Sequence, residues 1–394
     1  MPGYILSMMV ATLDHDPRLV SDISYVLTAL FIVGGTAIAW GTRTAIDWQK
    51  VGPIPLIIFG LWAYGVLLGV ANGVPLGMVF RNFAGMALYP FVYLVIVALN
   101  PRPKLVMQAF ILGSVCFVAM VIYLLLTVTP QGTVDSIGFI SMRYHYYLAT
   151  IAAVAVLLTL SVRAIVFREG QVWHALLAPV IFICLFYSGS RAFYAALAVS
   201  TAAVTLAMIP RWPLVARAIL LGAGYLVSAA ALAWGESGSA SNVRRAVARA
   251  IEMEVSADSP RSQQAAVIWS NIDLFGHGLG ASLGSFARDP VFTYALELSY
   301  VSLAHKIGIV GALIFLACAA FHVGKSLQAM VRSGFKSEAI MAVGLMGFLV
   351  SSWWNPTLFA PLFACLFCVS LYLREQVERD LVAVRGRSTE PAPA

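Results

Sequence analysis

The chain has 394 residues, of which 60% are hydrophobic and only 11% are charged, whereas a soluble domain typically carries about 25% charged residues. This composition excludes an ordinary soluble domain and indicates a polytopic membrane protein, because a bilayer core requires runs of roughly 20 apolar residues. The formal net charge of +7 does not indicate nucleic-acid binding, since most basic residues fall in short loops, where positive charge sets membrane orientation.

The apolar segments predict an all-α fold of membrane helices. Residues 4–13 come first, and they are short enough that the sequence leaves open whether they cross the membrane. Eleven predicted spans follow, at about 24–40, 53–70, 83–99, 105–128, 144–166, 172–188, 191–209, 214–234, 297–321, 339–354 and 357–373. The count is therefore eleven, or twelve with the first segment, in a single integral domain covering residues 1–394.

The cysteines indicate neither a disulfide framework nor a zinc site. All five lie in apolar segments, and the pair Cys365 and Cys368 forms a CxxC without a nearby histidine or acid. Packing within the helices is the interpretation that we favour for them over a redox role.

The basic residues of the loops predict the orientation. If the basic tail, residues 374–394, lies in the cytoplasm, every other loop on that side is net basic, as the positive-inside rule requires. The long segment 235–296 then faces outward, and it contains two helical patterns, at 241–255 and at 259–275.

The outward-facing loops contain arginines but no lysine. The planar guanidinium matches phosphate oxygens bidentately, whereas lysine is a point charge. Arg81, Arg143 and Arg191 each lie at the outer lip of a predicted span, where a charge is costly unless it faces a cavity or a partner. The alternative is chance combined with a genomic preference for arginine.

Glu297 begins the ninth predicted span. A carboxylate at a membrane lip loses hydration, which raises its pKa toward that of a useful general acid or base, although a helix-initiating glutamate favoured by the helix dipole is the simpler alternative. His305 lies on roughly the same helix face and Lys306 within the hydrocarbon region, which predicts a functional site or a buried ion pair. The alternating Gly276, Gly278 and Gly280 predict a tight turn rather than a dinucleotide site, because no strand precedes them.

Three segments resemble motifs of the bacterial O-antigen polymerase and O-antigen ligase superfamily of membrane glycosyltransferases. YSGSRAFYAALAV (187–199) resembles the family's Ser-Arg motif at the outer start of a span. RSQQAAVIWSNIDLFGHGLG (261–280) resembles the Arg, Trp and Gly-x-Gly segment that ends the large periplasmic loop. ELSYVSLAHKIGIVG (297–311) resembles the segment that runs into a span with Gly-x-x-Gly. The resemblance covers mainly residues 180–316.

The resemblance implies a GT-C-like fold in the bacterial inner membrane, with a large helical loop and an active site facing the periplasm. It implies a metal-independent glycosyltransferase without a cofactor, acting on a polyprenyl-diphosphate-linked glycan donor and a glycan acceptor. Membrane lipid, a chain-length regulator and a flippase are the partners that it suggests, with no nucleic acid. Arg191 and Arg261 occupy the arginine motifs and would stabilise the leaving diphosphate. Glu297 would deprotonate the acceptor hydroxyl, with Arg143 and Arg81 as second diphosphate ligands and His305, Lys306, His277 and His145 as secondary candidates.

The departure from the family pattern concerns Glu297. Ligase-like members usually place His-Asn eleven residues before the first glycine of Gly-x-x-Gly, whereas Glu297 and Leu298 stand there in this chain. We therefore favour a polysaccharide polymerase over a ligase that transfers the glycan to a lipid or protein acceptor. Two other classes stay open: a transporter or flippase using His305 and Lys306, although no internal repeat typical of transporters is visible, and a non-enzymatic assembly factor.

Overall fold

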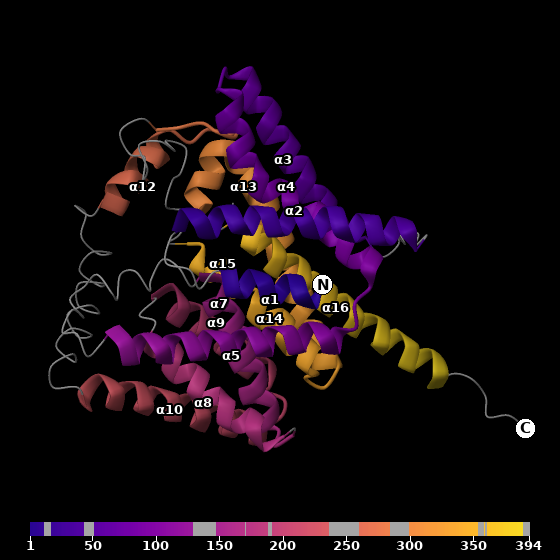
Figure 1. Cartoon of the computed structure of the whole chain (residues 1–394), viewed down its shortest axis with the longest axis vertical. Coiled ribbons are helices and arrows are strands. Elements are labelled where there is room, and N and C mark those ends of the chain that lie inside the picture. Colours follow the sequence, from indigo (N-terminus) through magenta and orange to yellow (C-terminus); the bar gives the residue numbers. More distant parts are fainter. Residues whose placement is uncertain are drawn as a thin grey trace, which may run out of the picture.

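The computed structural model describes residues 1–11, 17–42, 51–128, 147–169, 171–187, 191–235, 260–283, 299–353, 358 and 361–388. These residues form helices and turns, and no strand occurs among them (Figure 1). The helices are α1 (Pro2–Ala11), α2 (Pro17–Gly41), α3 (Pro53–Ala71), α4 (Leu76–Leu99), α5 (Pro103–Val128), α7 (Tyr147–Leu160) with its π-helical continuation η3 (Ser161–Val166), α8 (Val172–Tyr187), α9 (Arg191–Ala207), α10 (Trp212–Gly235), α12 (Pro260–Ser270), α13 (Ser299–Arg332), α14 (Ser337–Leu345), α15 (Phe348–Ser351) and α16 (Pro361–Ser388).

The predicted all-α class is confirmed for the described residues, and its membrane character is supported in part. Three helical stretches are long and apolar enough to cross a bilayer: Pro53–Ala71, Pro103–Tyr123 and Ser299–Arg332. Shorter apolar helices of 10–17 residues account for most of the other predicted spans. The total of eleven or twelve spans, the orientation and the GT-C architecture stay predictions.

The first apolar segment forms a helix that is too short to cross a bilayer by itself. α1 has 10 residues, which corresponds to about 15 Å at 1.5 Å per residue, half of a hydrocarbon core of about 30 Å. Its side chains Ile5 and Met8 are buried, and the Tyr4 hydroxyl lies 3.0 Å from Thr28 Oγ1 of α2. α1 therefore serves as a buried packing element.

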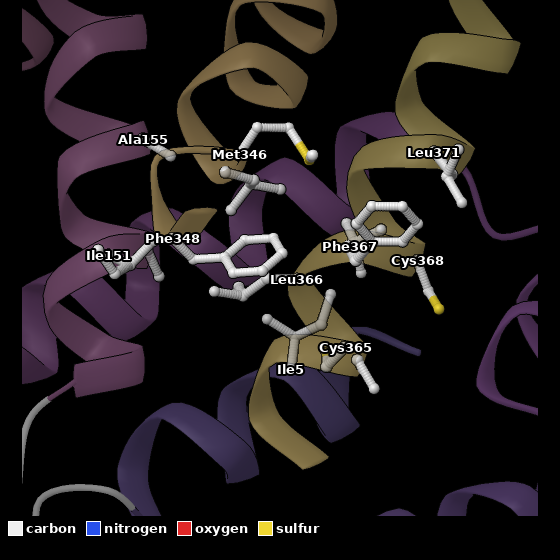
Figure 2. Packing of buried hydrophobic residues seen from close by; sticks show 14 of the residues in the cluster. Ile5, Ile151, Ala155, Met346, Phe348, Cys365, Leu366, Phe367, Cys368 and Leu371 are labelled. Carbon is white, nitrogen blue, oxygen red and sulfur yellow. The ribbon is translucent and has the colours of Figure 1, made fainter. Parts of the chain in front are cut away.

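The core surrounds α7, whose residues 151–157 are all at most 1% exposed. A helix that is apolar and buried on every side is a central helix, and α5, α8, α9 and α14 pack around it. Figure 2 shows Phe348 between Ile151 of α7 and Leu366 of α16, with Cys365 and Cys368 on the same stretch of α16 as Leu366. Both cysteines are free and buried, as expected for packing residues.

Three predicted spans differ from the helices observed. The helix that follows the long loop continues to Arg332 rather than ending near residue 321, and α16 continues to Ser388 rather than ending near residue 373. The span predicted at 339–354 is split into α14 and α15 by a turn at Met346 and Gly347. Hydropathy measures the length of an apolar run, whereas a helix continues into polar sequence wherever its backbone bonds are satisfied. These three predictions of helix boundaries were therefore wrong.

A polar network joins α16 to α4 and α13 where the apolar half of α16 ends. The Tyr93 hydroxyl donates a 2.5 Å hydrogen bond to Glu375 Oε2, and Arg374 Nη2 lies 3.2 Å from Glu375 Oε1. Arg374 Nη1 also lies 3.2 Å from His322 Nδ1, and His322 Nε2 lies 2.9 Å from Ser370 Oγ. The network positions α16 against both neighbours through partly desolvated charges.

Glu375 is expected to make the stability of this network depend on pH. Burial raises the pKa of Glu375, and the Tyr93 hydroxyl and Arg374 offset this only in part. A carboxyl group whose pKa is higher in the folded chain contributes stability that is complete below the unfolded pKa of about 4.3 and is lost as the pH rises through the folded pKa. The Tm of Glu375→Gln minus that of the wild type should therefore increase as the pH rises from about 4 to about 7.

Thermal unfolding in detergent across this pH range measures the difference. Glu378→Gln is the matched control, since Glu378 lies on the same helix with a side chain that is 41% exposed, and its Tm difference should change less with pH. If the Tm difference between Glu375→Gln and the wild type stays constant or falls as the pH rises, the raised pKa of Glu375 in the folded protein is contradicted.

Candidate active site

The predicted site residues fall into three groups in the structure. Glu297, Arg143 and His145 lie outside the described residues. Three arginines are placed by their backbone alone: Arg191 is the first residue of α9, Arg261 the second of α12, and Arg81 lies in the first half of α4. The side chains of His277, His305 and Lys306 are described, and the geometry of the site is therefore built from these three and from the elements that carry the arginines.

α13 is broken near its start. Gly308 has φ 77° and ψ 169°, a combination that is essentially restricted to glycine. The break separates a short helix, residues 299–307, from a long one, residues 309–332. The prediction of one continuous span from 297 to 321 is therefore wrong at this position, because a single backbone outlier interrupts the helical hydrogen-bond ladder.

The loop after α12 fills this break with its own backbone. The amides of His277 and Gly278 donate to the carbonyls of His305 (2.9 Å) and Lys306 (2.8 Å) at the end of the short helix. On the other side of the break, the amides of Ile309 and Val310 donate to the carbonyls of Asp273 (3.2 Å) and Leu274 (3.4 Å). Backbone groups freed inside an apolar helix need partners within the protein, and this loop supplies them.

The same loop is attached to α3. The amide of Leu279 donates to the carbonyl of Gly65 (2.8 Å), the Tyr64 hydroxyl donates to the carbonyl of Phe275 (2.8 Å), and Asn72 Nδ2 donates to the carbonyl of His277 (3.1 Å). Figure 1 shows the chain after α12 running across to the ends of α3 and α13. Bonds to two helices make this loop a fixed part of the scaffold.

The alternating glycines are explained by direct contact between backbones. A Cβ atom at Gly278 would lie 2.1 Å from the amide nitrogen of Gly69, and one at Gly276 would lie 2.3 Å from that of Gly308. Gly276, Gly278 and Gly280 also have positive φ angles of 84°, 92° and 83°. The amides of residues 276–279 all donate within the protein, so the segment is the predicted tight turn and not a phosphate cradle.

Two histidines meet where the loop crosses the short helix of α13. The ring centroids of His277 and His305 are 4.7 Å apart, and His277 Nε2 lies 2.6 Å from the carbonyl oxygen of Asn271 and 3.9 Å from Asp273 Oδ2. His305 is 3% exposed and Lys306 is 1% exposed. His305 Nδ1 is buried and has no hydrogen-bond partner among the described residues, so it is an unsatisfied polar atom beside the break in α13.

The cluster is not arranged as a metal centre. Within the described ranges, no three His, Cys, Asp or Glu side chains gather closely enough to hold a metal ion. The chemistry available here is that of imidazole, ammonium and carboxylate groups at a helix break.

Two helices that carry candidate arginines contact α13. α9, which begins at Arg191, and α12, which carries Arg261, each pack against α13, whose first residue, Ser299, follows Glu297 by two positions. A Cβ atom at Gly280 would lie 2.8 Å from the amide nitrogen of Val79, so the glycine loop touches α4 two residues before Arg81. The elements that carry Arg191 and Arg261 therefore contact α13, and the element that carries Arg81 contacts the glycine loop.

Sequence reasoning missed several residues that build this site. Asp273 Oδ1 accepts hydrogen bonds from the amides of Phe275 (2.9 Å) and Gly276, a turn typical of Asp that precedes glycine. Gly65 and Gly69 allow the loop to approach α3, and a Cβ atom at Gly69 would lie 2.5 Å from the carbonyl oxygen of Leu279. Their spacing of four residues is the small-xxx-small pattern of close helix contacts. This pattern could have predicted from the sequence that another segment approaches α3 closely here.

Comparison with known proteins adds no relative. No protein-family model matches this chain, and no curated protein matches it. The resemblance to the O-antigen enzymes therefore depends on the three sequence motifs and their order alone.

Proposed function

We propose that the chain is a metal-independent membrane glycosyltransferase that polymerises polyprenyl-diphosphate-linked oligosaccharide units at the periplasmic face of the bacterial inner membrane. The observation that supports the proposal is the set of helices around α13. The helix that begins at Arg191 and the helix that carries Arg261 each pack against α13, and the residue expected to act as base lies two positions before the first turn of α13. We call the start of α13, with the glycine loop that fills its break, the α13 junction.

The proposed reaction is a displacement at the anomeric carbon of the donor glycan. The acceptor hydroxyl attacks this carbon and loses its proton to the Glu297 carboxylate, while the bond to the diphosphate oxygen breaks and its electron pair leaves with the lipid diphosphate. Arg191 and Arg261 stabilise the charge that develops on this leaving group, with Arg81 and Arg143 as further ligands. The O-antigen resemblance implies inversion at the anomeric carbon.

The glycine loop has a positioning role in this proposal. Catalytic groups act efficiently only when rigid elements hold them in place. The loop joins α12 to α13 through backbone hydrogen bonds, so the distance between the Arg261 backbone and the outer end of α13 is restricted. His277 and His305 lie beneath this junction, where the buried His305 Nδ1 has no hydrogen-bond partner among the described residues.

Two alternatives use the same elements differently. A ligase would transfer the glycan once to a lipid or protein acceptor, and Glu297 in place of the family's histidine weighs against it. A transporter or flippase is favoured by one observation, the broken helix beside the buried Lys306, because discontinuous helices often bind substrates in transporters. Here, however, the loop's own backbone occupies both ends of the break.

Purified protein should convert a synthetic polyprenyl-diphosphate oligosaccharide into a ladder of longer glycans when EDTA is present. The arginines supply the positive charge that a divalent cation supplies in metal-dependent enzymes, so chelation should leave the rate unchanged. Gel electrophoresis of the fluorescently labelled glycan measures the product lengths. Transfer of one unit to a distinct acceptor would indicate a ligase, and passage of the labelled lipid across vesicles without a new glycosidic bond would indicate a transporter.

A further inference from the structure

A cavity lies between α5, α7 with η3, α8 and α14, and none of the residues that line it belongs to α13 or the glycine loop. It has a volume of about 720 Å³, within the range of roughly 300–1,000 Å³ that is typical of small-molecule sites. Its walls include the start of α5 and the π-helical turn that follows α7. π-Helical turns occur frequently at functional sites.

The lining changes from charged to apolar along α5. Lys104 and Gln108 line the cavity near the start of this helix, and Ile111, Leu112 and Val115 line it further along. Residues 104 and 115 are about 16 Å apart along the axis, at 1.5 Å per residue. α7 runs past them, with Val156 and Arg163 also lining the cavity. A polar end and an apolar end in one cavity fit an amphiphile better than a uniformly polar solute.

The charged end of the cavity carries as many basic as acidic side chains. It contains Lys104, Arg163, Glu169 and Glu338. Arg163 forms an ion pair with Glu169 and donates to the carbonyl of Phe335 (3.2 Å). Arg163 and Glu169 therefore neutralise each other within the protein. Lys104 and Glu338 form no ion pair with another described residue, which leaves one cation and one anion for a ligand.

We propose that this cavity binds a phospholipid whose headgroup carries both a phosphate and a primary ammonium, as in phosphatidylethanolamine. Lys104 pairs with the phosphate, Glu338 accepts hydrogen bonds from the ammonium, and the acyl chain lies along Ile111, Leu112 and Val115. A purely anionic headgroup would pair with Lys104 but leave the Glu338 carboxylate without a partner, and a quaternary ammonium has no N–H group to donate to Glu338. In the proposed orientation the site lies at the cytoplasmic end of the helices, opposite the glycosyl-transfer site, and is independent of it.

The test is native mass spectrometry of the full-length protein after exchange into vesicles with equal parts of phosphatidylethanolamine, phosphatidylglycerol and phosphatidylcholine bearing identical acyl chains. Retained phosphatidylethanolamine should exceed each of the others about fivefold, the effect of roughly one ion pair at a partly exposed site. Glu338→Gln should abolish most of this enrichment, because only the ammonium of phosphatidylethanolamine donates to Glu338. Lys104→Gln should lower the retention of all three lipids, because each of them carries the phosphate that Lys104 pairs with. Lys325→Gln and Glu378→Gln are matched controls outside the cavity and should preserve it.

A variant of the apolar end separates a lipid from a free headgroup. Leu112 is 50% exposed, so Leu112→Trp should fill the cavity without disturbing the core and should reduce retention of the intact lipid. Soluble glycerophosphoethanolamine is the probe for headgroup binding alone, and it should bind far more weakly than the lipid. Preferential retention of phosphatidylglycerol, enrichment that survives Glu338→Gln, lipid retention unchanged by Lys104→Gln, or equal binding of the soluble headgroup would each overturn the proposal. Circular dichroism and size-exclusion chromatography confirm that each variant is folded.

Discussion

Gly308→Ala is expected to destabilise the protein by about 3 kcal/mol or more and to abolish glycosyl transfer. Gly308 has φ 77° and ψ 169°, where a side chain is strained, and a Cβ atom would lie 2.3 Å from the carbonyl oxygen of Leu274 and 2.4 Å from the carbonyl carbon of Phe275. These contacts are with backbone atoms that cannot rotate away. The loop would have to move off α13, and four backbone hydrogen bonds across the break would be lost or weakened.

Thermal unfolding in detergent should show a Tm lower by about 3–4 °C or more. The matched control is Gly324→Ala on the same helix, where a Cβ atom meets nothing within 4 Å. This control should leave the Tm unchanged or slightly higher, because alanine favours a helix by roughly 0.5–1 kcal/mol. Equal Tm values for Gly308→Ala and Gly324→Ala would show that the break in α13 is not a structural requirement.

Glu297→Gln is expected to reduce polymerisation at least about 100-fold while the protein still inserts and folds. Glutamine keeps the size of the side chain but cannot accept the proton of the acceptor hydroxyl. Arg191→Ala and Arg261→Ala should each lower turnover by roughly 100- to 1,000-fold, the effect of removing one donor from a developing negative charge. Product ladders at equal protein concentration measure all three effects.

The arginine assignment has its own controls. Arg191→Lys and Arg261→Lys keep the charge but lose the guanidinium fork, so they should recover only part of the activity. Arg332→Ala changes an arginine at the far end of α13 and should leave the ladder unchanged. Full-length polymer from Glu297→Gln would remove Glu297 from the role of base, and full activity in either alanine variant would remove that arginine from the site.

The sequence predicted the helices best where apolar length alone decides them. The span predicted at 53–70 is α3, Pro53–Ala71, and the one at 105–128 is α5, Pro103–Val128. It predicted the end of α13 and the split between α14 and α15 poorly, since both depend on which backbone groups find partners. The alternating Gly276, Gly278 and Gly280 correctly predicted a tight turn. They did not predict that this turn contacts α3 and α13.

The sequence by itself determined that this chain is built of apolar helices and that alternating glycines stand at 276, 278 and 280 before an apolar helix that contains His305 and Lys306. These features follow from local composition and periodicity. Only the tertiary structure decided that α13 breaks at Gly308, that the glycine loop supplies its backbone partners, and that α9 and α12 pack against α13. Hydrogen bonds between residues about 30 positions apart along the chain leave no periodic trace in the sequence, so folding had to bring them together.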